Sequence, residues 1–378
     1  MALSLAAAAA PQGQPFSNWF KYRADIADEW EIAGDPAKPT VVSIRPRGEQ
    51  KGPVKRVLVV YPRASSAYDI AITKVLEVFH SKEMNAHFVV VNFELKDARA
   101  KEAIQFAEEN KFDLIFSMGS ESTAWLYDHY RGGPIPVVSI CSKDPVQLGQ
   151  MKDYEQGSGI NFAFTSLNMP VEVQMAYIMD LKPDLKNLAI LVDSKNISSV
   201  QTQAEPIATH ARQKGVQIIM GSVQNPAKAR EELAQIIPDA VRTMRKSDPD
   251  LSKSVFLITG STAVFREIRT INEKADRVPV VSMIPEIVTA GQDTAVLAMG
   301  ISFESNAHLA AIYGADILNG RAKSSELKVG IVSPPDIAIS FLKAREIGLR
   351  VPFGFFETAT FIYDYEGRPA RTSAGKSQ

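Results

Sequence analysis

Two stretches of the 378-residue chain repeat the same short signals in the same order, and this constrains the fold more than any other feature. The first stretch carries Gly119-Ser120 and later Pro136-Val137-Val138-Ser139. The second carries Gly260-Ser261 and later Pro279-Val280-Val281-Ser282, at nearly the same separation. Either match alone has little weight, but both in one order indicate an internal duplication. The chain is long enough for two lobes of ordinary domain size.

Both stretches alternate apolar runs with helical patterns. The run Val57–Val60 is typical of a buried parallel strand, and Ile72, Val75, Leu76 and Phe79 then recur at helical spacing. This alternation predicts an α/β fold of two doubly wound parallel-sheet lobes, with a ligand cleft between the lobes. We expect further strands at 87–93, 113–118, 135–140, 186–192, 216–220, 254–259 and 278–283, and helices at 98–110, 120–130, 204–214, 227–245 and 262–274.

The remaining segments are expected to complete the two lobes. Residues 15–52 form an extension with one strand near 40–44, and Pro238 is expected to kink or split its helix. After residue 283 we expect a strand near 295–301, a helix at 307–318, a strand at 328–331 and a helix at 337–346. The expected first lobe is 53–160 with 285–330, the second lobe is 161–284 with 331–366, and 367–378 is a tail.

The composition excludes several functional classes. Lys and Arg number 42 and Asp and Glu number 43, so the net charge of −1 gives no electrostatic footprint for nucleic acid. The single cysteine, Cys141, cannot form an internal disulfide or a cysteine-rich metal site, and the apolar run before it predicts a buried, inert thiol.

The N-terminus resembles a secretory signal. Ala6–Ala10 follow a short apolar start and precede Pro11, but no basic residues come first, so residues 1–14 are either a signal remnant or an Ala-rich tail. No other stretch approaches the about 18–20 apolar residues that span a bilayer. These features predict a soluble, extracytoplasmic and thus periplasmic protein.

The expected ligand groups follow the carboxyl ends of the strands, where open α/β sheets bind their ligands. Serine and threonine there cap helices in any protein, so each single turn has a purely structural reading as well. Five such turns in two matched lobes favour a polar cleft, with glycines that admit a close approach of the backbone. The candidate ligand-binding residues are Ser65, Ser66, Tyr68, Gly119, Ser120, Ser122, Thr123, Ser142, Lys143, Asn196, Ser198, Ser199, Gly260, Ser261 and Thr262.

Signatures of catalysis are largely missing from the sequence. There is no G-x-S-x-G elbow, Walker A loop or G-x-G-x-x-G motif, and the five histidines do not pair at metal-ligand spacing. A two-lobed enzyme needs a matched acid and base, one from each lobe, whereas the matched positions here carry hydroxyls. We therefore expect no enzyme activity, no metal and no cofactor.

The sequence resembles a known family. The segment Asp113–Asp144, then Gly159-Ile160-Asn161-Phe162, and above all Ala310–Gly320 with Ile347-Gly348-Leu349 resemble ABC-type substrate-binding proteins of the TrpX-like group. The resemblance covers roughly residues 56–363. It implies a type I periplasmic binding protein, here expected as a monomer, whose lobes close over a small solute and deliver it to an ABC transporter permease.

Two positions depart from that family. Its frequent Thr-Asp-Asn reads Thr259-Gly260-Ser261 here, and its later Tyr-Gly-x-Asp reads Met299-Gly300-Ile301-Ser302. The carboxylates that would face an amine are therefore missing, and a buried ammonium without a counter-charge is costly. This favours a small carboxylate or a neutral solute, aromatic ones included. The alternatives are a sensory ligand-binding module acting through a partner and, after it, a two-lobed enzyme.

Overall fold

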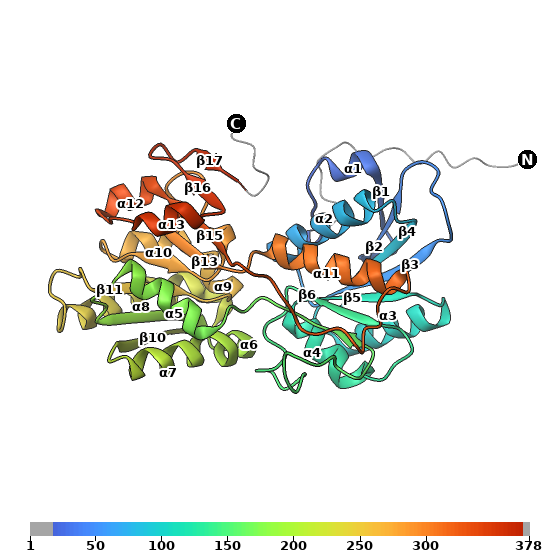
Figure 1. Ribbon diagram of the computed structural model, residues 1–378, viewed down its shortest axis with the longest axis horizontal. Coiled ribbons are helices and arrows are strands. Elements are labelled where there is room, and N and C mark those ends of the chain that lie inside the picture. The colour runs from blue at the N-terminus through green and yellow to red at the C-terminus, as the bar shows by residue number, and fades with distance from the viewer. Residues whose placement is uncertain (1–17, 373–378) are drawn as a thin grey trace, which may run out of the picture. The chain divides into compact units, whose positions relative to one another are not determined.

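The computed structural model of the protein describes residues 18–372, which form two compact units (Figure 1). Unit 1 comprises the described residues up to 142 together with 154–165 and 307–330. Unit 2 comprises 143–153, 166–306 and the described residues from 331 onward. The expected signal segment at 1–14 lies outside the described part of the chain.

Unit 1 is built on a seven-stranded sheet with the order β1-β2-β4-β3-β5-β6-β7. The strands from β4 to β7 are parallel, and β2 and β1 add to this sheet as an antiparallel hairpin. The strands are β1 (Trp30–Asp35), β2 (Lys38–Pro46), β3 (Lys55–Tyr61), β4 (Ala86–Asn92), β5 (Leu114–Met118), β6 (Val137–Ile140) and β7 (Phe162–Ala163). The helices are α1 (Ile26–Glu29), α2 (Ser66–Ser81), α3 (Asp97–Glu109), α4 (Gly119–Tyr130) and most of α11 (Phe303–Leu318).

Aromatic rings fill the core of unit 1. Phe79 of α2 packs edge-on against Phe88 of β4 and Phe116 of β5, with ring centroids 5.2 and 6.0 Å apart. Trp30 of β1 contacts Phe88 at 5.6 Å, which ties the hairpin to this core. Helix α11 packs on the same sheet (Figure 1), because a Cβ at Gly314 would meet the ring of Phe116 at 2.4 Å.

Unit 2 is built on an eight-stranded sheet with the order β10-β9-β11-β12-β13-β15-β16-β17. The strands from β10 to β13 are parallel, and β15 runs antiparallel to β13. The strands are β9 (Asn187–Asp193), β10 (Gln217–Val223), β11 (Ser254–Ile258), β12 (Val280–Ser282), β13 (Leu297–Gly300), β15 (Asp336–Ser340), β16 (Phe361–Tyr363) and β17 (Pro369–Arg371). A separate two-stranded sheet pairs β8 (Thr165–Ser166) with β14 (Gly330–Ile331).

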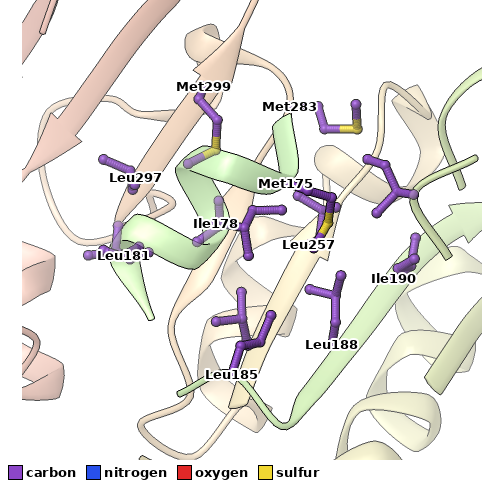
Figure 2. Close-up of a cluster of buried hydrophobic side chains, with 14 of the residues drawn as sticks. Met175, Ile178, Leu181, Leu185, Leu188, Ile190, Leu257, Met283, Leu297 and Met299 are labelled. Atoms are coloured by element: carbon purple, nitrogen blue, oxygen red, sulfur yellow. The ribbon is translucent and has the colours of Figure 1, made fainter. Parts of the chain in front are cut away.

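Helices cover both faces of the unit 2 sheet. On one face, Ile178 of α5 packs among Leu188 and Ile190 of β9 and Leu257 of β11 (Figure 2). On the other face, Leu191 meets Ile236 of α8 across Gly221. The helices are α5 (Val171–Leu181), α6 (Ile197–Ser199), η1 (Val200–Ala204), α7 (Glu205–Gln213), η2 (Pro226–Lys228), α8 (Ala229–Arg245), α9 (Thr262–Phe265), α10 (Ile268–Lys274), η3 (Pro285–Ile287), α12 (Phe341–Ile347) and α13 (Phe353–Thr358).

The predicted fold class is confirmed, and the two units repeat one topology. The strand order β4-β3-β5-β6 of unit 1 recurs as β10-β9-β11-β12 in unit 2, and in both units helical segments connect successive strands. The matched glycines of the sequence repeat lie at the end of the third strand of this order. Gly119 directly follows β5, and Gly260 lies two residues beyond the end of β11. Cys141 is buried, as expected.

Several details differ from the sequence predictions. The extension contributes a two-stranded hairpin instead of one strand, and α8 continues through Pro238 without splitting. The expected helix at 337–346 is wrong for its first part, because β15 occupies Asp336–Ser340 before α12 begins. Its Ile337, Ala338 and Ile339 are all buried between two strands, and a short apolar run has no periodicity that separates strand from helix.

The segment 285–306 was expected in the first lobe, but β13 within it pairs with β12 and β15 in the sheet of unit 2.

Among residues 18–372, no helix combines the length and the apolar character that crossing a membrane requires.

Candidate functional site

The carboxyl ends of β3, β5 and β6 lie at one edge of the unit 1 sheet, and the predicted residues of this lobe follow them. Ser65 caps α2, since its Oγ accepts a hydrogen bond from the Ala67 N–H at 3.3 Å. Ser66 is exposed beside it. Ser142 follows β6, and its hydroxyl lies 3.5 Å from that of Ser120 at the start of α4. The edge therefore gathers hydroxyls from three neighbouring turns.

Tyr68 occupies the space over Gly119. Gly119 has φ +79°, and a Cβ there would stand 2.1 Å from the Tyr68 phenol oxygen. The Tyr61 hydroxyl donates to the Tyr68 carbonyl oxygen at 3.0 Å, which helps to fix the first turn of α2. Burial, and secondarily the charge of Glu121, raise the pKa of Tyr68 above its usual range, so the phenol is neutral at physiological pH. The space left by the missing side chain of Gly119 is thus filled by Tyr68, a residue of the same unit.

Ser122 and Thr123 have structural roles in this arrangement. Both are fully buried, and the Ser117 hydroxyl lies 2.9 Å from that of Ser122 and 3.1 Å from that of Thr123. Ser122 Oγ also donates to the Val60 carbonyl at 3.1 Å, and Thr123 Oγ1 donates to the Gly119 carbonyl at 2.9 Å. These bonds fix α4 to β3 and β5 and use the donor capacity of both hydroxyls.

In unit 2 the turn after β9 presents three predicted residues. Asn196 Oδ1 accepts from the Ser199 N–H at 3.2 Å and from the Ser198 hydroxyl at 3.0 Å, so it caps α6. The Ser199 hydroxyl is buried, and among the described residues it has no hydrogen-bond partner. A buried polar atom of this kind costs stability unless it is hydrogen-bonded.

Lys143, Gln203 and Gly260 form the centre of the unit 2 site. The Gly260 N–H donates to Gln203 Oε1 at 2.8 Å, and a Cβ at Gly260 would stand only 2.0 Å from Lys143 Nζ. Lys143 is 5% exposed and Gln203 is 1% exposed. The site therefore holds a buried ammonium and a carboxamide directly over the backbone after β11.

Lys143 was expected in the first lobe, but it belongs to unit 2. The Asp144 N–H donates to Asn168 Oδ1 at 3.3 Å, and Asn168 Nδ2 donates to the Thr202 carbonyl at 2.6 Å. These bonds connect the segment of Lys143 to the π-helical turn η1 that carries Gln203. The sequence repeat gave no sign of this connection, because it joins segments that are far apart along the chain.

Ser261 and Thr262 complete the turn after β11. The Ser261 hydroxyl accepts from the Asp193 N–H at 3.3 Å and lies 3.1 Å from Thr259 Oγ1, so it holds β11 against β9. Thr262 begins α9 and is half-buried. Of the two, only Thr262 retains solvent access.

Glu286 is a further polar group at this edge, after β12. Its Oε1 accepts from the Phe303 N–H at 2.5 Å, while its Oε2 is buried without a hydrogen bond to the described residues. Burial is the main cause that raises the pKa of Glu286 from 4.5 to about 8, and the nearby charge of Asp336 adds to it. Asp336 itself accepts from the Ser302 N–H at 3.1 Å. Both carboxyls thus serve the start of α11.

No group of three or more His, Cys, Asp or Glu within 18–372 is placed to hold a metal ion. The candidate polar groups at the two sheet edges are the Tyr68 phenol in unit 1, and Lys143, Gln203 and Ser199 in unit 2.

Comparison with known proteins gives the family. The family model described as "ABC transporter substrate binding protein" matches residues 70–355, which is most of the chain. No curated protein matches the chain significantly.

Solved structures share the fold. A conserved domain protein from Vibrio cholerae aligns with a TM-score of 0.64 at 21% identity, over 82% of this chain and 99% of that one. An ABC domain from Streptococcus pneumonia in complex with L-Trp aligns with a TM-score of 0.64 at 16% identity, over 82% and 100%. A ligand-free, open substrate-binding protein with adhesive properties from Clostridium difficile aligns with a TM-score of 0.60 at 16% identity, over 81% and 98%.

Proposed function

Because the chain belongs to the family of ABC transporter substrate-binding proteins, we propose that it binds a small solute outside the cytoplasm and delivers it to an ABC permease. The protein acts as a receptor in this proposal and returns its solute chemically unchanged. Closure of the two lobes over the solute, which the sequence resemblance implies, stays a prediction.

The observation that carries the proposal is the arrangement of Lys143 and Gln203 over Gly260. Lys143 presents a buried ammonium next to the Gln203 carboxamide, and hydrogen bonds from an ammonium to an anionic or strongly accepting ligand group are the stronger kind. Gln203 adds a carboxamide beside it, and the turn after β9 adds the buried Ser199 hydroxyl. This set supports a small carboxylate or a neutral solute rich in acceptors; the sequence predicted a small carboxylate or a neutral solute, aromatic ones included.

Glu286 fits the same proposal. With a pKa of about 8, the Glu286 carboxyl is mostly protonated at pH 7. The side chain is then a neutral hydrogen-bond donor rather than a counter-charge for an amine. Glu286 thus supplies no full negative charge after β12 to balance an amine. A solute with an acceptor at one end fits this edge better than one with a free ammonium there.

The experiment is a thermal-shift screen of the purified chain against small carboxylates, aromatic acids, amides and amino acids. A ligand at 100 times its Kd adds about 2.7 kcal/mol to the free energy of unfolding, which is a clear shift in Tm. Lys143→Met is expected to weaken a hit at least about tenfold, since hydrogen bonds to charged groups contribute about 1.5–3 kcal/mol. Lys152→Met changes an exposed lysine of the same segment and serves as the matched control.

Chromatography of the hit after incubation checks whether it is returned unchanged. Consumption of the hit would contradict the receptor and favour the enzyme. Equal affinity in wild type and Lys143→Met would contradict the placement of the site.

A further inference from the structure

Unit 2 contains a pocket of about 320 Å³ at the edge of its sheet opposite to Lys143 and Gly260. We call it the amino-edge pocket. Its wall includes Val280, the first residue of β12, and Asp293, which precedes β13, so it lies at the amino ends of the parallel strands. Lys343 lines it from α12, which follows the antiparallel β15 and therefore starts at this same edge. A pocket of this size suits a small organic molecule.

A buried cation lies in the wall of the amino-edge pocket. Lys343 is only 8% exposed, and its Nζ lies 2.5 Å from Glu346 Oε2 one turn further along α12. Its backbone N–H donates to Ser340 Oγ at 3.2 Å, which caps the helix and fixes the position of the lysine. A charge buried to this extent is a feature of a built site rather than of an ordinary solvated crevice.

A second cation is presented by an unusual loop. Asp276 and Arg277 have φ values of +53° and +32°, a region that residues other than glycine rarely adopt. The conformation is secured on both sides, because Asp276 pairs with Arg245 and because Ala275 and Val278 are buried. Arg277 lines the pocket, and its guanidinium makes no ion pair or side-chain hydrogen bond within residues 18–372. Because Arg277 is exposed, the fold presents a solvated guanidinium in the wall of the pocket, where an anion can reach it.

The other charges of the pocket are already balanced against one another. Glu273 Oε1 lies 3.0 Å from Arg269 Nε, and Glu346 pairs with Lys343. The hydrogen bond that Arg269 donates to Glu273 raises the pKa of Arg269, and the charge of Asp293 adds to this, so the guanidinium serves both carboxylates. Three carboxylates in the wall repel polyanions, whereas the unpaired Arg277 attracts a single negative charge.

We propose that the amino-edge pocket is a second small-molecule site, independent of the solute site, which takes a small organic monocarboxylate. The carboxylate pairs with Arg277, the cation of the pocket wall that has no ion pair among the described residues. The short apolar body of the ligand lies against Val278, Val280 and Ile347. A bidentate pairing of carboxylate and guanidinium gives such a site its orientation.

The test is a titration of the full ¹⁵N-labelled chain with 3-methylbutanoate, followed by NMR. We expect saturable shift changes in the amides of 269–278, 280, 292–294 and 341–347. Arg277→Gln is expected to raise the Kd at least tenfold, and Gln292→Trp, which fills the pocket from its exposed rim, is expected to block binding. Arg212→Gln, which changes an exposed arginine of the same unit, is the matched control and leaves the Kd unchanged.

Citrate and the uncharged 3-methylbutanamide are the comparison ligands, and both are expected to bind at least tenfold more weakly. Three results would overturn the proposal: no saturable change near the pocket, an equal Kd in wild type and Arg277→Gln, or shift changes confined to 142–143, 196–203 and 260–262. The last result would assign the carboxylate to the solute site alone.

Discussion

Lys143 Nζ lies over Gly260, at 2.0 Å from where a Cβ of that residue would stand. Only glycine at position 260 leaves room for the ammonium, and the same glycine donates its N–H to Gln203. The side chain of one segment and the backbone of another thus define a single donor site. The proposed solute contact depends on this pairing.

Gly260→Ala is expected to displace the flexible end of Lys143 and so to weaken solute binding at least about tenfold, which corresponds to about 1.4 kcal/mol. The free energy of unfolding should change little, because the atom that must move is the end of a lysine side chain. Calorimetric titration with a screened solute measures the affinity. Gly354→Ala, at a position with nothing within 4 Å, is the control and should bind normally.

Gly119→Ala tests the packing of Tyr68. Gly119 and Gly132 have nearly the same φ, +79° and +81°, but a Cβ at Gly132 meets nothing within 4 Å. Both alanine variants therefore place a residue with a Cβ in a left-handed backbone conformation that favours glycine. Only Gly119→Ala must also move a buried ring. Since overpacking costs about 1–3 kcal/mol, we expect Gly119→Ala to lower Tm by several degrees more than Gly132→Ala in scanning calorimetry. Equal shifts would show that the Tyr68 contact carries no energy.

Glu286 makes stability depend on pH. Its pKa in the folded chain is about 8, above the usual value of 4.5, so the folded state binds more protons than the unfolded state between these values. Stability contributed by the protonated form is complete below about pH 4.5 and is lost as the pH rises through about 8. Glu286→Gln removes the titration, so its free energy of unfolding relative to wild type should rise by at least about 1 kcal/mol from pH 5 to pH 8.5. Denaturant unfolding at both pH values measures this, and a constant difference would contradict it.

Ile178→Ala tests the core of unit 2. Ile178 is fully buried beside Leu188 and Leu257 (Figure 2), so its truncation leaves a cavity and should cost about 2–5 kcal/mol. Val173 of the same helix is 38% exposed, and Val173→Ala should stay within about 0.5 kcal/mol of wild type. The comparison is made by denaturant unfolding, and similar losses in the two variants would place the core elsewhere.

Most of the fold could be predicted from local patterns. Continuous apolar runs such as Val57–Val60 and the helical spacing of Ile72 and Phe79 each mark an element without knowledge of its partners. The repeated glycine and proline signals then predicted two lobes of one topology. The short strand β15 was misread as helix, because Ile337 and Ile339 are buried on all sides and their pattern has no period.

Less of the candidate site could be predicted. The serines at strand ends are local signals, but Ser122, Thr123 and Ser261 turn out to bind their own unit, a role that a single sequence does not distinguish from ligand binding. Gln203 carried no motif, because its place over Gly260 depends on the π-helical turn. The assignment of Lys143 to unit 2 depends likewise on where the chain passes between units, which is a property of tertiary packing.

The most direct test of the proposed function is native mass spectrometry of the full chain with a solute from the screen, followed by release and chemical identification. The proposal predicts one solute per chain, released unchanged, with occupancy lost in Lys143→Met and kept in Lys152→Met. Equal occupancy in Lys143→Met, or release of a converted product, would contradict a receptor whose solute is held by Lys143 over Gly260.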